Sequence, residues 1–224
     1  VLQIIHGDEV QGKALVSADI DLIVFTGSKS AGEHILGSAS NGLKRVILEL
    51  GGKDPMVVLE GADLDAAVAF GVRNAFRNAG QVCVSTERIY VDEKIADDFE
   101  ARFVEKTREL VQGNGMDEGV AIGPMITTQQ KALVTAQIEE AVSDGANVLH
   151  GGGTGEGNFV PLTVLSGLSH DMRIMRDETF GPVACIQRIS SDEEAIELAN
   201  DTPYGLGACV WGETEHAAGV ARHI

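Results

Sequence analysis

Hydrophobic residues recur in two patterns along this chain. Short unbroken apolar runs, bounded by glycine or polar residues, alternate with longer stretches in which apolar residues recur every three or four positions. The first pattern predicts buried strands, and the second predicts amphipathic helices. Strands are expected near residues 2–5, 22–25, 46–50, 56–59, 88–91, 147–149, 159–165, 183–189 and 206–211. Helices are expected near residues 11–17, 29–40, 63–78, 95–111, 127–143 and 192–199, with a last helix reaching residue 224.

This alternation of strands with helices favours an α/β fold with parallel strands. We see neither an internal repeat nor a low-complexity linker. Because the first expected strand begins without a cap or lead-in, we expect the chain to be part of a longer protein.

Charge narrows the range of partners. The 224 residues include 34 acidic and 17 basic side chains, which give a formal charge of −17. This charge disfavours nucleic acid and anionic membrane surfaces as partners. No apolar run reaches the roughly 18 residues that cross a bilayer, so we expect a cytoplasmic protein. An anionic substrate would need a local cationic anchor.

The cysteines indicate thiol chemistry more than cross-linking. Cys83, Cys185 and Cys209 are far apart and outside any CxxC pattern, which predicts a reducing compartment without a disulfide framework or a metal site. Cys83 follows a predicted helix and the helix-breaking Gly80. A thiol on such a turn could meet an approaching electrophile, although an ordinary buried cysteine would fit the same pattern.

Two further positions, both near the ends of predicted strands, carry residues that could bind a ligand or transfer a proton. Gly27 and Ser28 form a turn from a strand to a helix, where free amide groups could bind phosphate. A plain connecting turn is the alternative, because the full G-x-G-x-x-G pattern is absent. Glu49 interrupts an apolar strand, so its carboxyl group must be paired, exposed at the strand end, or neutral with a raised pKa. The last case would suit a general base.

Five motifs carry a family resemblance together. They are FTGS at 25–28, LELGGK at 48–53, NAGQVC at 78–83, ETFGPV at 178–183 and ANDTPYGL at 199–206. In this order and spacing they resemble the NAD(P)-dependent aldehyde dehydrogenase superfamily. The resemblance covers essentially the whole chain, but it implies that the family's N-terminal half and extreme C-terminus are missing. It implies that residues 1–50 end a Rossmann-like cofactor domain and that residues 51–224 form an α/β catalytic domain.

The resemblance assigns roles to individual residues. Cys83 would be the nucleophile that forms a thiohemiacetal and then a thioester, and Glu49 would be the general base that activates the hydrolytic water. Gly27, Ser28 and Leu50 would contact the cofactor, NAD or NADP. Glu178 would bind the nicotinamide ribose, and Phe180 would pack near the nicotinamide. The resemblance also implies a homo-oligomer, either a dimer or a tetramer, at full length.

The FRNAGQ sequence before the cysteine is similar to the succinate-semialdehyde dehydrogenase branch of this family. In that branch the residue matching Arg77 helps to bind the substrate carboxylate. The alternative is a surface arginine that interacts favourably with the helix dipole. Some members of the branch have a second cysteine two residues after the nucleophile. Here that position is Ser85, so we expect no disulfide switch.

Two other functions are compatible with the same residues. Cys83 and Glu49 could serve a thiol acyltransferase or hydrolase that uses no nicotinamide. The chain could also be a catalytically incomplete binding or oligomerisation module, because the resemblance places the family's asparagine oxyanion donor before Val1. We therefore expect the isolated chain to be inactive.

Overall fold

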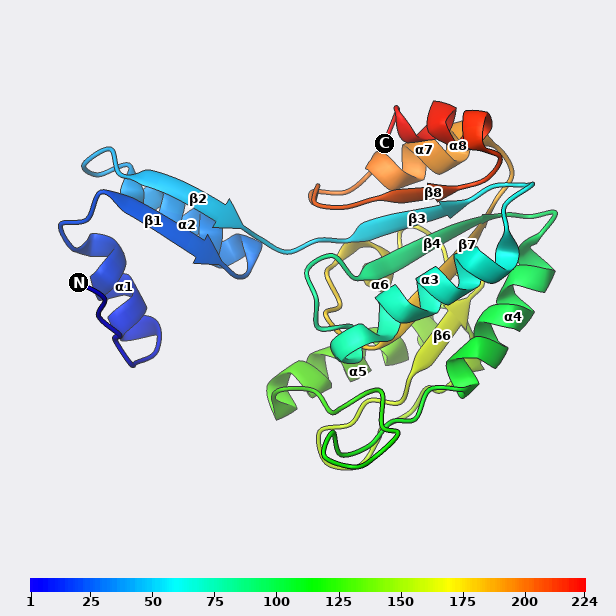
Figure 1. The fold of residues 1–224 in the computed structure, drawn as a ribbon, viewed down its shortest axis with the longest axis horizontal. Helices are drawn as coiled ribbons and strands as arrows, with labels where there is room; N and C mark the ends of the chain where they lie inside the picture. The colour runs from blue at the N-terminus through cyan, green and yellow to red at the C-terminus, as the bar shows by residue number, and fades with distance from the viewer. The chain divides into compact units, whose positions relative to one another are not determined.

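The structure, a computed structural model, describes residues 1–224, which divide into two compact units, Val1–Gly51 and Gly52–Ile224. Each unit has its own hydrophobic core. Both units combine helices with parallel strands, as Figure 1 shows, so the predicted α/β fold class is confirmed. None of the helices combines the length and the apolar character that crossing a membrane requires.

The first unit is built on two parallel strands, β1 (Leu22–Thr26) and β2 (Arg45–Glu49). Their register confirms that the apolar runs at 22–25 and 46–50 are neighbouring strands of one sheet. The connecting helix α2 (Lys29–Ala39) packs its apolar side against the strands, and Ile23, Ile35 and Ala39 are buried together. Helix α1 (Glu9–Ser17) precedes them and has no buried residue.

The strand expected at residues 2–5 is absent. This segment has no regular structure, and the side chains of Leu2 and Ile4 are exposed at 89% and 75%. A strand needs a neighbour for its backbone hydrogen bonds, and no strand of this chain pairs with the segment. The prediction was wrong because an apolar run does not reveal whether a partner strand is available.

The second unit contains a six-stranded sheet in the order β5-β6-β7-β4-β3-β8. Neighbouring strands are parallel except for β5 and β6, which are antiparallel. The strands are β3 (Asp54–Val58), β4 (Thr86–Asp92), β5 (Asn147–His150), β6 (Thr163–Ser166), β7 (Val183–Ile189) and β8 (Cys209–Trp211). All five residues of β3 are buried, as expected of a strand inside a covered parallel sheet.

Helices cover this sheet. In Figure 1, α3 and α4 lie side by side in front of it, and α7 and α8 lie beside β8. The apolar residues predicted at three- and four-residue steps in α3 form its buried side: Ala67, Val68, Gly71, Val72 and Ala75. The helices are α3 (Leu64–Phe76), α4 (Ala96–Arg108), α5 (Thr128–Ser143), α6 (Arg173–Arg176), α7 (Asp192–Asn200) and α8 (Thr214–Ala221), with the 3-10 helix η1 (Arg77–Gly80).

Several predicted boundaries differ from the structure. The strand expected at 159–165 begins only at Thr163, because Pro161 has no backbone N–H to donate to a sheet. The strand expected at 206–211 begins at Cys209, after Gly205 and Gly207. The short helix α6 was not predicted, because four residues are too few to show a period.

Candidate active site

Cys83 lies in a loop whose backbone is tightly defined. Helix α3 ends at Phe76, two residues earlier than predicted, and three consecutive residues then adopt left-handed conformations: Asn78 (φ 55°), Ala79 (φ 56°) and Gly80 (φ 68°). The side chains of Asn78 and Gln81 each donate to the other residue's carbonyl oxygen, both at 3.0 Å. The thiol that follows is partly exposed, so Cys83 is not an ordinary buried cysteine.

The cysteine loop lies directly against the turn that precedes β7. A Cβ atom added to Gly80 would overlap the carbonyl oxygen of Gly181, so only glycine allows this approach of the two backbones. Residues about one hundred positions apart are thereby brought together. The loop around Cys83 and the turn that carries Glu178 and Phe180 form one site.

Gly52 lies between the main chain of Cys83 and the side chain of Glu178. A Cβ atom at Gly52 would overlap the Cys83 carbonyl oxygen, and the Gly52 amide donates to Glu178 Oε1 at 3.0 Å. Burial raises the pKa of the Glu178 carboxyl, and the negative charge of Glu87 raises it further. The hydrogen bond from Gly52 and the positive charge of Lys53 lower this pKa and so reduce the shift. Glu178 is therefore a half-buried acid that Gly52 links to the Cys83 backbone.

A buried ion pair, which no sequence pattern predicted, supports the turn that carries Glu178. Lys53 Nζ lies 2.6 Å from Glu87 Oε2 and donates to Thr179 Oγ1 at 3.0 Å. The same carboxylate accepts hydrogen bonds from the backbone amides of Thr179 and Phe180, at 2.8 and 2.9 Å. Lys53 belongs to the LELGGK motif, which was the only available signal; Glu87 lies between the polar residues Thr86 and Arg88, so its position in the sequence does not distinguish it.

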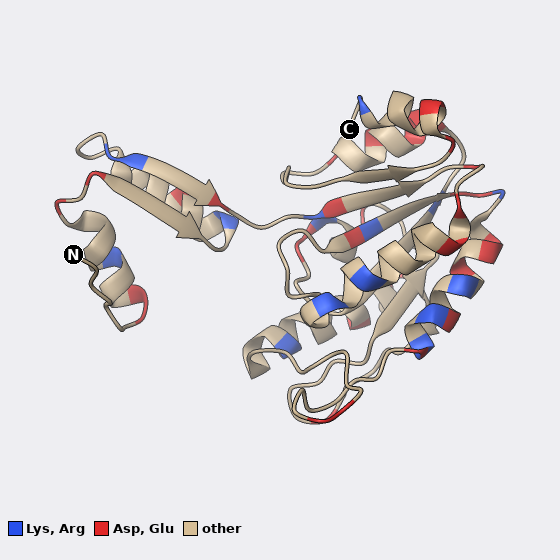
Figure 2. Cartoon of the chain, viewed as in Figure 1, with Lys and Arg blue, Asp and Glu red and all other residues tan.

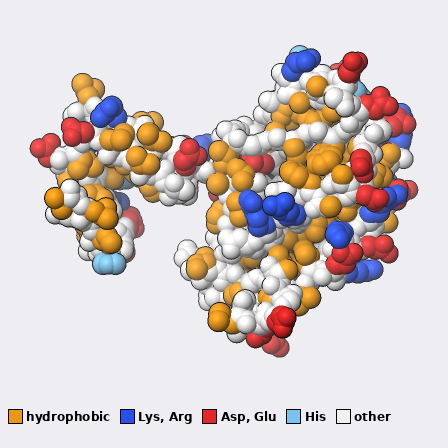
Figure 3. Space-filling view, in the orientation of Figure 1, with side chains coloured by type: hydrophobic (Ala, Val, Ile, Leu, Met, Phe, Trp, Pro, Cys, Tyr) orange, Lys and Arg blue, Asp and Glu red, His pale blue; other side chains and the backbone are white.

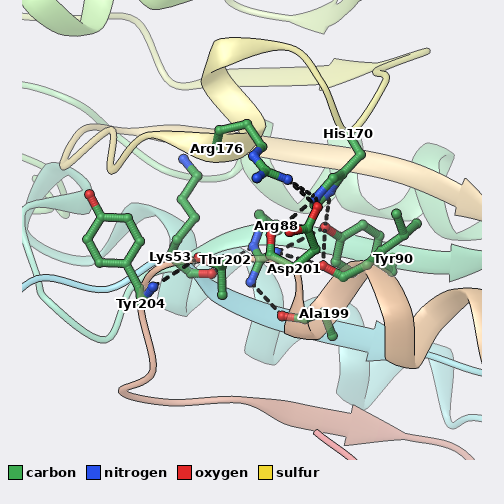
Figure 4. A network of polar contacts seen from close by, with 10 residues as sticks. Lys53, Arg88, Tyr90, His170, Arg176, Ala199, Asp201, Thr202 and Tyr204 are labelled. Carbon is green, nitrogen blue, oxygen red and sulfur yellow. Dashed lines mark hydrogen bonds and ion pairs between the residues drawn. The ribbon is translucent and has the colours of Figure 1, made fainter.

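A second buried polar network surrounds Arg88, shown in Figure 4. Its guanidinium is fully buried and donates to the backbone carbonyl oxygens of Lys53, Leu198 and Ala199 at 2.8 to 3.0 Å. Tyr90, next in the network, hydrogen-bonds His170 Nδ1 at 3.1 Å. These contacts join β4 to the last turn of α7, where the ANDTPYGL segment begins.

Arg77 is exposed at the end of α3, at the start of η1, and forms no ion pair within the chain. Arg73, one helical turn earlier, is also exposed and without a carboxylate partner. Figure 2 shows basic positions along α3, and Figure 3 shows Lys and Arg side chains on the surface of the second unit. The guanidinium of Arg77 is therefore available to an external anion.

The first unit carries the other predicted site residues. Glu49 ends β2 with an exposed side chain, and its carbonyl oxygen accepts from the Gly27 amide at 3.0 Å. Ser28 is the N-cap of α2, and its hydroxyl accepts from the Ala31 amide at 3.2 Å. Leu50 packs against Gly32 of the same helix. The unit thus brings together Glu49, Gly27 and the open N-terminus of α2 at the end of β2.

All three cysteines are unpaired. Cys185 is completely buried in β7, and burial raises the pKa of its thiol to about 12. Burial also raises the pKa of the Cys209 thiol to about 11. Neither of these two side chains is in a state suited to nucleophilic attack.

Asp54 is a buried acid beside the same site. Its Oδ1 accepts from the Gly207 amide at 3.0 Å, and the residue is 7% exposed. Burial raises the pKa of this carboxyl from 3.8 to about 6, although the Gly207 amide and Arg88 both favour the ionised form. Folding therefore disfavours the charge that Asp54 carries at neutral pH.

Replacing Asp54 with asparagine should stabilise the chain at neutral pH. Since the pKa is higher in the folded state, ionisation of Asp54 lowers stability as the pH rises from about 4 through 6. We expect Asp54→Asn to raise the free energy of unfolding by about 1–3 kcal/mol at pH 7.5 and by little at pH 4. Urea unfolding of both proteins at the two pH values measures this. Exposed Asp117→Asn is the control, and a gain for Asp54→Asn that does not depend on pH would contradict the prediction.

The fold and the site together define a class of protein. The fold consists of two α/β units, and the site consists of a cysteine loop with a carboxylate-bearing turn packed against it. The whole chain, residues 1–224, matches the aldehyde dehydrogenase family and belongs to it. It is 45% identical over 201 residues to salicylaldehyde dehydrogenase of Pseudomonas sp. (strain C18), covering 89% of this chain and 41% of that protein.

Solved structures agree with this assignment. An aldehyde dehydrogenase from Brucella melitensis biovar abortus 2308 superimposes with a TM-score of 0.96 and 39% identity, covering all of this chain and 47% of that one. Betaine aldehyde dehydrogenase from Staphylococcus aureus, in complex with NAD+, gives a TM-score of 0.90 at 33% identity, covering 95% of this chain and 44% of that one. The chain therefore spans less than half the length of these relatives.

Proposed function

We propose that this chain supplies the nucleophile and the general base of an NAD(P)-dependent aldehyde dehydrogenase. The observation that supports this best is the placement of Cys83. Its loop is fixed by three left-handed residues and packed against both Gly52 and the turn that carries Glu178. In this proposal residues 1–50 are the end of the cofactor domain and residues 51–224 form the catalytic domain.

The proposed chemistry divides aldehyde oxidation into two easier steps. Cys83 Sγ adds to the aldehyde carbon while a base takes up the thiol proton, which leaves the thiohemiacetal as an oxyanion. A bound NAD(P)+ would supply the acceptor for the hydride that leaves this carbon, and the oxyanion would collapse to the thioester. Glu49 then removes a proton from a water molecule, which attacks the resulting thioester. The C–S bond breaks, the carboxylic acid leaves and the Cys83 thiol is regenerated.

Each unit, taken by itself, carries residues that fit a part of a dinucleotide. The first turn of α2 has amide groups without partners inside the helix, and Ser28 and Gly27 lie at its N-terminus, which suits a pyrophosphate. Leu50 packs beside this helix. Glu178 uses Oε1 for Gly52, so its other oxygen suits a ribose hydroxyl, and Phe180 offers an apolar surface beside it. The Staphylococcus aureus relative in complex with NAD+ supports this assignment.

We further propose that the substrate is a short aldehyde with a carboxylate, such as succinate semialdehyde. A chain of charge −17 repels an anion unless a cation is placed near the thiol. Arg77 is exposed, lacks an ion-pair partner and precedes Cys83 by six positions.

Cytoplasmic location and assembly into a dimer or tetramer are further parts of the proposal. Light scattering of the protein at its complete natural length tests the assembly.

Turnover of an aldehyde panel with NAD+ and NADP+, using the protein at its complete natural length, tests the proposed reaction. The Arg77→Ala variant tests the substrate. A charged hydrogen bond contributes about 1.5–3 kcal/mol, so kcat/KM for succinate semialdehyde should fall about ten- to a hundredfold while that for butanal changes little. Arg108→Ala, which removes another exposed arginine without an ion-pair partner, is the matched control.

Three outcomes would count against parts of this proposal. Equal losses on both aldehydes would make Arg77 a structural residue at the helix end. A wild-type preference for butanal would remove the carboxylate from the substrate while leaving the dehydrogenase proposal intact. Turnover of no aldehyde with either cofactor would remove the dehydrogenase proposal itself.

A further inference from the structure

The turn formed by residues 178–180 is held by two consecutive residues of another segment. Gly52 donates its amide to the Glu178 side chain, and Lys53 donates to Thr179 Oγ1. Glu87, from the start of β4, accepts from the backbone amides of Thr179 and Phe180. The conformation of this turn is therefore set from outside by three residues.

The ion pair within this arrangement is deeply buried. Lys53 is 1% exposed and Glu87 is 3% exposed. Both carboxylate oxygens of Glu87 are used, Oε2 by Lys53 and Thr179 and Oε1 by Phe180. Buried ion pairs seldom add net stability over well-packed apolar residues of similar size, so stability alone does not explain this one. A role in holding one particular conformation is the better explanation.

The conformation that is held is an uncommon one. Phe180 has φ +49°, in the left-handed region that residues other than glycine rarely adopt. Such a residue persists where its surroundings determine its conformation. Without the Glu87 carboxylate, the amides of Thr179 and Phe180 would lose their acceptor, and the turn could relax toward a commoner conformation. Glu178 and Phe180 would then point elsewhere.

We infer that Lys53 and Glu87 are positioning residues that aim Glu178 and Phe180 at the cofactor. This inference rests on the proposed function, because it assumes that these two side chains bind a nicotinamide dinucleotide. Lys53 acts through Glu87 and Thr179, and Glu87 acts through the two backbone amides. Neither residue needs to touch the cofactor or the substrate.

Variants of Thr179 and Glu87 test this inference in the protein at its complete natural length. Thr179→Val is nearly isosteric but removes the acceptor for Lys53, and Glu87→Gln removes the charge while keeping one oxygen. We expect each to raise both the Kd and the KM for the cofactor that the wild type uses by roughly tenfold, the effect of one lost hydrogen bond to a charged group. Thr179→Ser keeps the hydroxyl and should restore wild-type values.

Two measurements separate positioning from general destabilisation. Titration calorimetry gives the Kd without turnover, and hydrolysis of 4-nitrophenyl acetate without cofactor reports the Cys83 thiol, so ester hydrolysis should change less than twofold. Tyr90→Phe removes a hydrogen bond from the network around Arg88, which reaches Lys53 only at its backbone carbonyl oxygen, and is the control for lost stability. It should leave the cofactor Kd unchanged.

The possible results are distinct. If the wild type binds neither NAD+ nor NADP+, the proposed function fails, whatever the variants do. If the wild type binds one of them and Thr179→Val and Glu87→Gln bind it equally well, only the positioning inference fails. It also fails if Tyr90→Phe weakens binding as much as they do, or if Thr179→Ser does not restore it.

Discussion

Replacing Cys83 with alanine should abolish aldehyde oxidation. Alanine offers no atom that can form the thiohemiacetal, so Glu49 would have no thioester to hydrolyse. We expect kcat to fall on the order of 10⁴-fold or more, since removing the nucleophile of a covalent mechanism removes the pathway itself. The absorbance of the reduced cofactor, followed in the protein at its complete natural length, measures this.

Cys209→Ala is the matched control, because it removes a partly buried thiol that the proposed mechanism does not use. It should keep turnover within a fewfold of wild type. Near-normal oxidation by Cys83→Ala would show that another group attacks the aldehyde, and the proposed mechanism would have to be abandoned.

Replacing Gly80 with alanine should have the largest effect on stability. A methyl group there would overlap the Gly181 carbonyl oxygen, and the residue has φ +68°. The left-handed conformation costs about 1–2 kcal/mol for a residue with a Cβ atom. Overpacking against backbone adds roughly 1–3 kcal/mol, which gives an expected loss of about 2–5 kcal/mol. Urea unfolding of the chain measures the change.

Gly153→Ala separates these two contributions. Gly153 has φ +70°, and a Cβ atom there would meet nothing within 4 Å. This control should therefore lose only the conformational part, about 1–2 kcal/mol. If Gly80→Ala cost no more than Gly153→Ala, the contact between the cysteine loop and the Gly181 turn would not be as tight as described.

The fold was largely predictable because most strands here are short apolar runs inside a covered sheet. The pairing of β1 with β2 followed from two such runs separated by a helix. The segment at residues 2–5 has the same local composition and forms no strand. The runs that form strands have a partner strand beside them, and residues 2–5 do not. A local sequence pattern does not predict whether a partner strand is present.

The site was predictable only as separate motifs. The local pattern indicated Cys83, and the family resemblance indicated Glu178 and Phe180, but neither indicated the ion pair that holds the turn carrying Glu178 and Phe180. Lys53 and Glu87 are 34 positions apart, and the turn they hold is about 90 positions further on. The left-handed residue Ala79 was also unexpected, since alanine ordinarily favours the right-handed helical region. Tertiary contacts determine both features.

The contrast between the three thiols has a practical use. Thiolates, and not thiols, react with alkylating reagents such as iodoacetamide. With the pKa of Cys185 raised to about 12 and that of Cys209 to about 11, these two sulfurs stay protonated near neutral pH. A small excess of reagent, added briefly to the folded chain near neutral pH, should therefore label Cys83 alone. The stoichiometry of that label, one per chain when every molecule is correctly folded, would count the competent molecules in a preparation before any substrate is known.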